Sequence, residues 1–453
     1  MHNTKKLVKA TVDGLFGKYT HSIEFQNDRH YLILFGENGV GKTKLLEIIN
    51  HLSNLDYTSL SNISFSAAKL QYSDGSELTA TRQMKDNDET DDDFSHYRII
   101  FKLTKPGSED AVWIPELSEF HEFLLRNTTY VPIAPDLWED TTDGEVTTFI
   151  ELTRRYRRPY MRMGQPSIET PESFTEFCQN TSTYLINTQR LSAIKTSADR
   201  NEFLTRFNPG SSHRTPTRIR ELSENIKEQL NRAQTEHSRL SQQKDRSFPS
   251  RVLQAVASGT HGDSAEIQSR YAEQNAFRDR LAKVVSVELP EELGPSNNLS
   301  KDWELALFDL YVRDATEKLE PFRLLLTRIE LLQSIINERL NGKKLSITDK
   351  GGLIVKRIDD DEVIDLDSLS SGEQHEIILL FDLLFNVKAG TTVLIDEPEI
   401  SLHIGWQISF IPDVEQIAKE VKFRFIVATH SPQIINGMWS MTTRLSAEGG
   451  VSS

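Results

Sequence analysis

A glycine-rich segment near residue 40 constrains the fold of this chain more than any other feature. Residues 36–43 read GENGVGKT, between an apolar, strand-like run at residues 31–35 and the apolar helical pattern of TKLLEIIN. The segment fits GxxxxGK(S/T), in which glycines let backbone N–H groups surround phosphates at the positive end of the following helix. A strand, a phosphate loop and a helix in this order predict an α/β fold built on a parallel sheet.

The residues of this loop have distinct expected roles. We expect the Lys42 ammonium to reach the β- and γ-phosphates of a nucleotide and the Thr43 hydroxyl to bind Mg²⁺. The other loop residues expected to bind the phosphates are Gly36, Asn38, Gly39 and Gly41. Such loops serve kinases, GTPases, motors and switches alike, so the loop alone does not define the function.

A second part of a nucleotide site lies far along the chain. Residues 393–395 (VLI) form an apolar run typical of a buried parallel strand, and the run ends in Asp396 and Glu397. Ligands of open α/β sheets bind at the carboxyl ends of strands, so we expect Asp396 to hold Mg²⁺ and Glu397 to activate the attacking water. About 350 residues separate this strand from the phosphate loop. Because small kinases and GTPases place the two elements much closer, something large lies between them here.

The segment LSSGEQ, residues 369–374, allows two interpretations. Ser370 and Glu373 have the spacing of a capping box at the start of an apolar helix. An exposed Ser-Ser-Gly at a helix N-terminus is also an anion site, because Gly372 lets the backbone approach a phosphate closely. The second interpretation makes Ser370, Ser371, Gly372 and Glu373 candidate nucleotide-binding residues.

A histidine stands at the end of a further strand-like run. Residues 423–428 (FRFIVA) predict a strand that is followed by the tripeptide THS. His430 at that edge can sense a γ-phosphate through a hydrogen bond. We therefore expect His430, together with Glu397, to act in catalysis.

Composition limits the class of protein. The 453 residues are 37% hydrophobic and 26% charged, as in a globular protein. The balance of 52 basic against 67 acidic residues gives a net charge of −15, so DNA contact would need a local basic patch. The segment that begins at Arg154 and ends at Arg162 is one candidate, and its alternative interpretation is an ordinary salt-bridged surface.

Cys178 is the only cysteine, so no intrachain disulfide is possible. No apolar run spans a bilayer and no secretory signal is visible, so we expect a cytoplasmic protein without membrane contact.

The middle of the chain has a helical pattern. From about residue 215, apolar residues recur near the heptad interval and predict an amphipathic helix of about 30 residues that ends around Pro249. A second helix is expected at residues 264–287, and a third from about Trp303 to Leu340 with a break or kink at Pro321. We therefore expect an N-terminal ATPase lobe at residues 1–212, a compact helical or coiled-coil insertion at 213–341 and a C-terminal ATPase lobe at 342–453.

The motifs together resemble the ABC-type ATPase heads of the SMC, Rad50 and OLD class. GENGVGKT resembles their Walker A motif, LSSGE the signature, VLIDEPE the Walker B motif, SLH the D-loop and THS the switch histidine. The resemblance implies a split head with a parallel sheet and antiparallel strands, and hydrolysis of ATP with Mg²⁺ as cofactor. It also implies a glutamine, called the Q-loop glutamine, that binds the metal. We assign this role to Gln189, which follows the strand-like segment TYLIN, in preference to Gln71.

The resemblance also implies how the chain assembles. In such heads the nucleotide lies between the Walker A motif of one subunit and the signature of another, so two copies are expected to meet head to tail about a two-fold axis. The segments GLFGKY, NTQRL and THSPQIIN are similar to those of bacterial anti-phage ATPases. The nearest groups are PtuA of Septu with its retron-linked relatives and, as the alternative, AriA of PARIS. Larger oligomers such as hexamers are then expected.

A separate nuclease partner is part of the same expectation. Only 23 residues (431–453) follow His430, which leaves no room for a nuclease domain at that point. The resemblance implies an HNH nuclease like PtuB or a Toprim nuclease like AriB. Two other classes of function remain open: a DNA-repair ATPase that acts directly on DNA, and an ATP-binding scaffold with little turnover. The net charge argues against the first, and phosphate release measured with and without DNA distinguishes all three.

Overall fold

The chain forms two compact units in the computed structural model. The first comprises Met1–Gln189 with Val387–Ser453, and the second comprises Arg190–Asn386. The structure describes residues 5–25, 29–84, 97–115, 123–125, 127–134, 137–142, 144–148, 151–152, 155–156, 170–188, 217–259, 262–285, 301–400 and 402–445. The domain boundaries predicted from the sequence, at 212/213 and 341/342, differ from the boundaries of these two units and stay a prediction.

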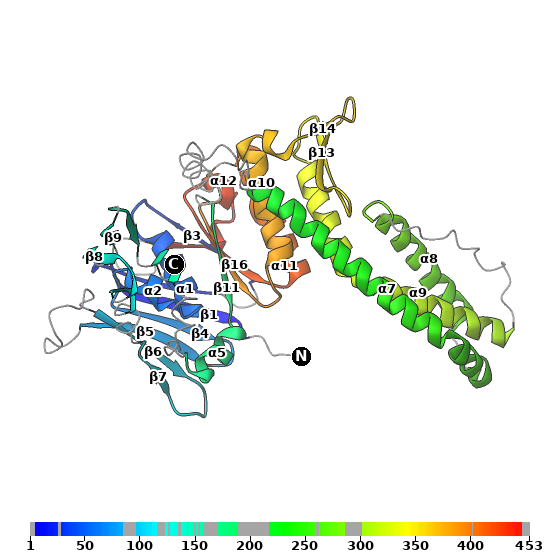
Figure 1. Cartoon of the computed structure of the whole chain (residues 1–453), viewed down its shortest axis with the longest axis horizontal. Coiled ribbons are helices and arrows are strands. Elements are labelled where there is room, and N and C mark those ends of the chain that lie inside the picture. Colours follow the sequence, from blue (N-terminus) through cyan, green and yellow to red (C-terminus); the bar gives the residue numbers. More distant parts are fainter. Residues whose placement is uncertain are drawn as a thin grey trace. The chain divides into compact units, whose positions relative to one another are not determined.

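The first unit contains a five-stranded parallel sheet (Figure 1). Its order is β11-β15-β16-β3-β17, and every neighbouring pair is parallel. The strands are β3 (Tyr31–Gly36), β11 (Thr183–Asn187), β15 (Thr392–Asp396), β16 (Arg424–Thr429) and β17 (Thr442–Leu445). Among the described residues of this unit, the helices include α1 (Lys42–Ser53), α2 (Tyr57–Ser61), α5 (Glu172–Gln179), α11 (Ile404–Val421) and α12 (Pro432–Ile435). The predicted α/β class with a parallel sheet is therefore confirmed.

Burial explains why the central strands are continuously apolar. All five residues of β15 are buried, and so are the last five of β16, as expected of parallel strands covered on both faces. On α1 the buried side chains include Leu45, Leu46 and Ile49, which recur at helical spacing. Strands from the two ends of the chain thus share one core with the helix that follows the phosphate loop.

Antiparallel sheets complete the first unit. A six-stranded sheet has the order β2-β1-β4-β5-β6-β7, and a three-stranded sheet has the order β10-β9-β8. Their strands are β1 (Leu7–Leu15), β2 (Tyr19–Glu24), β4 (Ala67–Tyr72), β5 (Glu77–Met84), β6 (Tyr97–Thr104), β7 (Ala111–Trp113), β8 (Tyr130–Ala134), β9 (Leu137–Asp140) and β10 (Val146–Thr148). Strands β1 and β2 pair antiparallel with each other.

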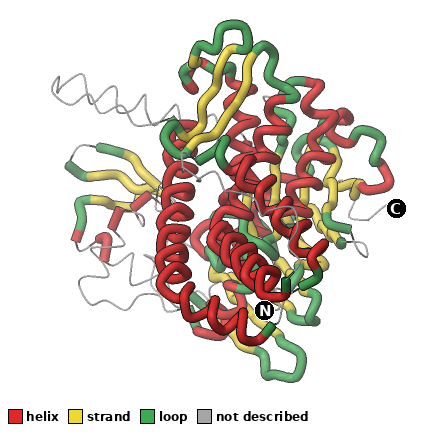
Figure 2. Tube along the Cα trace, turned by 90° about the vertical axis from the view of Figure 1, so that its right-hand side faces the viewer, coloured by secondary structure: helices red, strands yellow, loops and turns green. Residues whose placement is uncertain are grey.

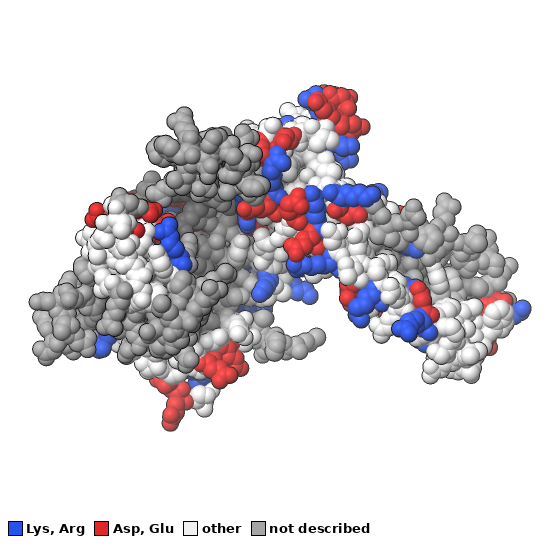
Figure 3. All heavy atoms as spheres, viewed as in Figure 1, with Lys and Arg blue, Asp and Glu red and all other residues white. Residues whose placement is uncertain are grey.

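The second unit combines long helices with a three-stranded sheet, which appears in yellow at the top of Figure 2. Helices α7 and α8 both pack against α9 (Figures 1 and 2). Its described elements include α7 (Arg218–Ser258), α8 (Ser264–Leu281), α9 (Asp302–Asn337), α10 (Ser371–Phe381), its π-helical continuation (Asp382–Asn386), β12 (Lys343–Thr348), β13 (Gly352–Arg357) and β14 (Val363–Ile364). The predicted heptad positions from Ile219 to Ala233 are buried along α7. On the face in Figure 3, acidic and basic side chains of this unit are intermixed.

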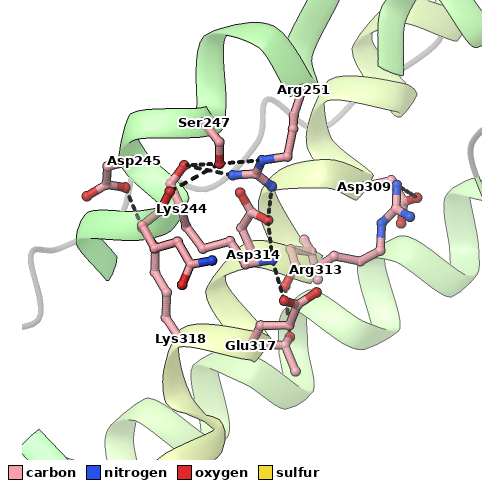
Figure 4. Close-up of polar contacts among 12 residues, drawn as sticks. Lys244, Asp245, Ser247, Arg251, Asp309, Arg313, Asp314, Glu317 and Lys318 are labelled. Carbon is pink, nitrogen blue, oxygen red and sulfur yellow. Dashed lines mark hydrogen bonds and ion pairs between the residues drawn. The ribbon is translucent and has the colours of Figure 1, made fainter. Parts of the chain in front are cut away.

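The prediction that the first long helix ends around Pro249 is wrong, because α7 continues past it. A proline inside a helix has no N–H to donate to the preceding turn. Side chains supply donors to that turn: Ser247 Oγ lies 3.2 Å and Arg251 Nη2 2.8 Å from the carbonyl oxygen of Lys244. Arg251 also pairs with the buried Asp314 of α9, which fixes the helix on the far side of the proline (Figure 4).

Two buried carboxylates on α9 bind the neighbouring helices. Asp314 accepts from Arg251 and lies 3.4 Å from the Lys244 ammonium, both on α7 (Figure 4). Asp309 accepts from Arg270 of α8. Because a buried charge without a partner is costly, these pairs favour one alignment of the helices over shifted ones.

Candidate functional site

The phosphate loop connects β3 to α1 at the carboxyl edge of the parallel sheet. Gly39 and Gly41 have φ angles of +83° and +92°, which disfavour any residue with a side chain. A Cβ atom on Gly41 would also lie 2.5 Å from Cδ2 of Leu15, a fully buried residue at the end of β1. The helix begins directly afterwards, with Leu45 donating its N–H to the carbonyl of Gly41. The left-handed backbone therefore favours glycine at both positions, and close packing against Leu15 favours it further at Gly41.

A buried histidine holds the outer side of the same loop. His21 Nε2 lies 2.7 Å from the carbonyl oxygen of Val40, between the two positive-φ glycines. The His21 ring also stacks on Tyr19, with centroids 5.9 Å apart. Since the Val40 carbonyl is engaged there, the contact helps to hold the loop with its N–H groups free for an anion.

Lys42 lies at the centre of the site. Its ammonium donates to the carbonyl oxygens of Gly36 and Glu37 at 3.0 and 3.1 Å and lies 2.6 Å from His430 Nε2. Burial lowers the pKa of Lys42, and the negative charges of Glu397 and Asp396 oppose that shift. The lysine is thus a cation held among carbonyls and carboxylates, at the position where phosphate charge would be compensated.

Thr43 and Asp396 form the second contact between the loop and the acidic strand. The Thr43 hydroxyl donates to Asp396 Oδ1 at 3.2 Å. Burial raises the pKa of Asp396 to about 6, the hydrogen bond from Thr43 lowers it, and the charge of Glu397 raises it. A hydroxyl and a carboxylate side by side are the hard oxygen ligands that Mg²⁺ prefers, with phosphate and water completing its shell. In the described part of the chain no cluster of three His, Cys, Asp or Glu side chains could hold a metal.

Glu397 and His430 face each other at adjacent strand ends. Glu397 Oε1 lies 3.5 Å from His430 Nε2. Glu397 has a φ angle of +46°, a left-handed conformation that glutamate rarely adopts. Glu399 orients the histidine segment, because its Oε1 accepts from the backbone N–H groups of His430 and Ser431 at 2.6 and 3.1 Å.

These residues surround one cleft of about 540 Å³. It lies entirely within the first unit. Its described lining residues are Phe16, Asn38, Gly39, Gly41, Lys42, Thr43, Lys44, Glu397, Glu399, Ile400 and His430. The structure therefore brings together the predicted loop residues, the predicted base and the predicted histidine, with Asp396 in contact through Thr43.

The signature segment lies in the second unit, at the start of α10. Ser370 and Glu373 form the predicted capping box: the Ser370 hydroxyl accepts from the Glu373 N–H at 3.4 Å, and Glu373 Oε2 accepts from the Ser370 N–H at 2.9 Å. Lys343 pairs with the Glu373 carboxylate at 2.9 Å. Ser370 and Ser371 are exposed and Gly372 is half-buried, so the segment presents a helix N-terminus to solvent.

Some predicted residues lie outside the described part of the chain. Gln189 is one of them, and Ser401 of the D-loop is another. Of the arginine-rich segment, Arg155 and Tyr156 are described. Arg155 donates a hydrogen bond to the Tyr130 hydroxyl at 2.6 Å, and its guanidinium lies 3.9 Å from the Glu145 carboxylate. These contacts agree with the interpretation of this segment as a salt-bridged surface.

Sequence reasoning missed three residues that shape the site: His21, Thr188 and Glu399. Glu399 stands inside the Walker B-like segment VLIDEPE, and Thr188 directly precedes Gln189, so both residues belong to motifs that the sequence displays. His21 lies on β2 and has no local motif around it.

The chain belongs to the AAA ATPase domain family, whose sequence pattern matches residues 16–435. It is therefore an ATPase with an ATP-binding site. A probable ATPase of the retron Ec83 from Escherichia coli is 37% identical over 92 residues, which cover 18% of this chain and 17% of that relative. The chain thus matches less than a fifth of the curated relative's length.

Similar solved structures include two SMC head domains. The Smc head domain of Pyrococcus furiosus with an extended coiled coil, bound to the C-terminal domain of ScpA, is 15% identical, with 95% of this chain and 91% of that chain covered and a TM-score of 0.35. The SMC head domain of Thermotoga maritima is 9% identical, with 97% and 93% covered and a TM-score of 0.32. No helix in the described residues is long and apolar enough to cross a membrane.

Proposed function

We propose that this ATPase is a nucleotide-gated switch whose cleft binds and hydrolyses ATP with Mg²⁺. One observation carries the proposal: Lys42, Thr43, Asp396, Glu397 and His430 meet within hydrogen-bonding or ion-pair distance at three adjacent strand ends. They come from opposite ends of the chain, and such convergence of a cation, a hydroxyl, two carboxylates and a histidine suits phosphoryl transfer to water.

Each residue would have one task in this reaction. The loop N–H groups and Lys42 would bind the β- and γ-phosphates, and Thr43 and Asp396 would hold Mg²⁺. Bound Mg²⁺ would neutralise charge on the phosphate oxygens. Glu397 would accept the proton of the attacking water, and His430, within 3.5 Å of Glu397, would donate a hydrogen bond to the γ-phosphate. Glu399 would keep His430 in place through its two backbone contacts.

We further propose that two copies join head to tail through ATP. Each chain has one phosphate loop and one signature segment, and the exposed N-terminus of α10 with Ser371 and Gly372 offers N–H groups to a neighbour's γ-phosphate. ATP would then hold the interface and hydrolysis would release it. Larger oligomers, hexamers included, would need a second interface between dimers, because the two-fold dimer already uses both phosphate loops and both signature segments.

We also propose a role in bacterial anti-phage defence with a separate nuclease as effector. The partial similarity to the retron ATPase supports a defence setting. The motif resemblance to PtuA and AriA supports an HNH or Toprim nuclease as the partner. In such a complex the nucleotide state of the ATPase would control when the nuclease acts.

Two variants test the assembly when they are mixed. Lys42→Ala should abolish ATP binding, because backbone dipoles alone do not compensate the triphosphate charge. Gly372→Asp should still bind ATP but should fail to assemble with it, since a carboxylate would face the neighbour's γ-phosphate. Their mixed dimer has one site with both defects and one with neither, so hydrolysis should return to about half the wild-type level per dimer.

The capping-box interpretation makes the opposite prediction. Gly372 is the second residue of α10, and an acidic side chain in the first turn stabilises a helix through its dipole. If the segment is a helix cap and nothing more, Gly372→Asp alone will assemble with ATP and hydrolyse it normally. Analytical ultracentrifugation with ATP and phosphate release on the same samples decide between the two. Gly372→Ala, which adds a side chain without charge, is the matched control that separates the effect of the charge from that of the added side chain.

A further inference from the structure

Thr188 forms a hydrogen-bond clamp on the backbone that carries Glu397. Its Oγ1 lies 2.9 Å from the carbonyl oxygen of Asp396 and 2.7 Å from that of Glu397. The Thr188 side chain is buried. Thr188 is the residue directly after β11, whose parallel neighbour β15 ends at Asp396, so pairing of the two strands brings the hydroxyl to this turn.

The backbone at Glu397 requires support of this kind. A φ angle of +46° is costly for a residue with a side chain, and it persists only where neighbouring groups determine it. The left-handed turn lets two successive carbonyl groups converge on one hydroxyl, whereas successive carbonyls of an extended strand point in opposite directions. The Glu397 N–H is bound as well, to the carbonyl of Ala428 on β16 at 2.8 Å. Both backbone polar groups of Glu397 are therefore bound: the N–H by β16, and the carbonyl by Thr188 and by the Ile400 N–H at 3.2 Å.

The clamp determines where the Glu397 carboxylate lies. The direction of a side chain follows from the backbone that carries it, and here the carboxylate lines the nucleotide cleft beside His430. Thr188 does not line that cleft, and its hydrogen bonds go to the backbone. We propose that Thr188 is a positioning residue that holds the Glu397 carboxylate in the orientation needed to activate water. This inference rests on the proposed role of Glu397 as the general base.

A threonine that merely stabilises the fold would behave differently from a positioning residue. Removing its hydroxyl would leave the two carbonyl oxygens without this donor and would lower the melting temperature, but turnover of the folded enzyme would not change. A positioning residue acts on the rate of hydrolysis through Glu397 and leaves ATP affinity alone. Measuring ATP turnover and ATP affinity separately therefore distinguishes a positioning role of Thr188 from a merely stabilising one.

Three variants make this separation. Thr188→Val removes the hydroxyl at nearly constant size, and Thr188→Ser keeps it. Thr181→Val is the matched control, because Thr181 is equally buried, precedes β11 and donates to the carbonyl of Phe177 at 3.0 Å. We expect Thr188→Val to lose about 10- to 100-fold in ATP turnover, the cost of a misplaced catalytic group. Its ATP affinity should change by less than about twofold, and Thr188→Ser and Thr181→Val should turn over ATP as the wild type does.

Combination with Glu397→Gln completes the test. If Thr188 acts through Glu397, adding Thr188→Val to Glu397→Gln causes no further loss of turnover. Unchanged turnover in Thr188→Val, or an equal further loss in the Glu397→Gln background, would overturn the clamp while leaving the role of Glu397 intact. Full turnover in Glu397→Gln alone would instead refute Glu397 as the base, and the clamp with it. Should Thr188→Val fail to fold, Thr188→Cys, whose thiol is a weak donor, replaces it with the same expected separation.

Discussion

Adding one methyl group at Gly41 should distort the phosphate loop and lower the free energy of unfolding, by an amount that follows from two features of the structure. Gly41→Ala places a side chain at φ +92°, which costs about 1–2 kcal/mol. The new Cβ would also lie 2.5 Å from Leu15 Cδ2, and Leu15 is fully buried. Overpacking of that kind costs about 1–3 kcal/mol. We therefore expect Gly41→Ala to lose about 2–5 kcal/mol in urea unfolding, with loss of ATP binding measured by calorimetry.

Gly39 and Leu15 provide the controls for this prediction. Gly39 has a similar φ angle of +83°, but nothing lies within 4 Å of an added Cβ. Gly39→Ala should therefore lose the backbone part only, about 1–2 kcal/mol. Leu15→Val removes the clashing carbon at a cost of about 1 kcal/mol by itself. In the Gly41→Ala/Leu15→Val double variant the two losses should not add, because one change relieves the other. Strict additivity, or equal losses at Gly39 and Gly41, would refute the reasoning.

Three further predictions concern other parts of the molecule. His21→Phe should weaken ATP binding about tenfold because the Val40 carbonyl loses its donor, whereas His21→Gln, which keeps a donor, should bind ATP nearly normally in calorimetry. Asp314→Ala should cost about 3–5 kcal/mol in urea unfolding because it leaves the Arg251 and Lys244 charges without their buried partner, while the exposed Asp245→Ala should cost less than about 1 kcal/mol. Burial raises the pKa of the Cys178 thiol to about 12, so alkylation at pH 8 should be on the order of a thousandfold slower than for a free thiol and should accelerate only on unfolding or as the pH approaches 12.

Short sequence motifs predicted those parts of the site that depend on consecutive residues. The phosphate loop, the buried strand that ends in Asp396 and the capping box at Ser370 each depend on a few consecutive residues, and the structure places the first two in contact through Thr43. The apolar residues of α7 at heptad spacing predicted a long helix, because the spacing of apolar residues reflects burial of one helix face.

The contacts that hold the site together join distant parts of the chain, and no local pattern predicts which residues meet. The His21 contact with Val40 and the Thr188 contact with Asp396 depend on how strands pair across the sheets. The predicted end of α7 at Pro249 was wrong for the same reason: tertiary contacts of a neighbouring arginine outweighed the local effect of the proline.

Phosphate release from Glu397→Gln under saturating ATP and Mg²⁺ tests the central claim most directly. The variant keeps Thr43, Asp396 and Lys42, so calorimetry should find ATP affinity close to that of the wild type. Hydrolysis should fall by about 10²- to 10⁴-fold, because the group that accepts the proton of the attacking water is gone. Wild-type hydrolysis in a variant that binds ATP normally would contradict the account, and a wild-type protein that binds ATP without releasing phosphate would favour an ATP-binding scaffold instead.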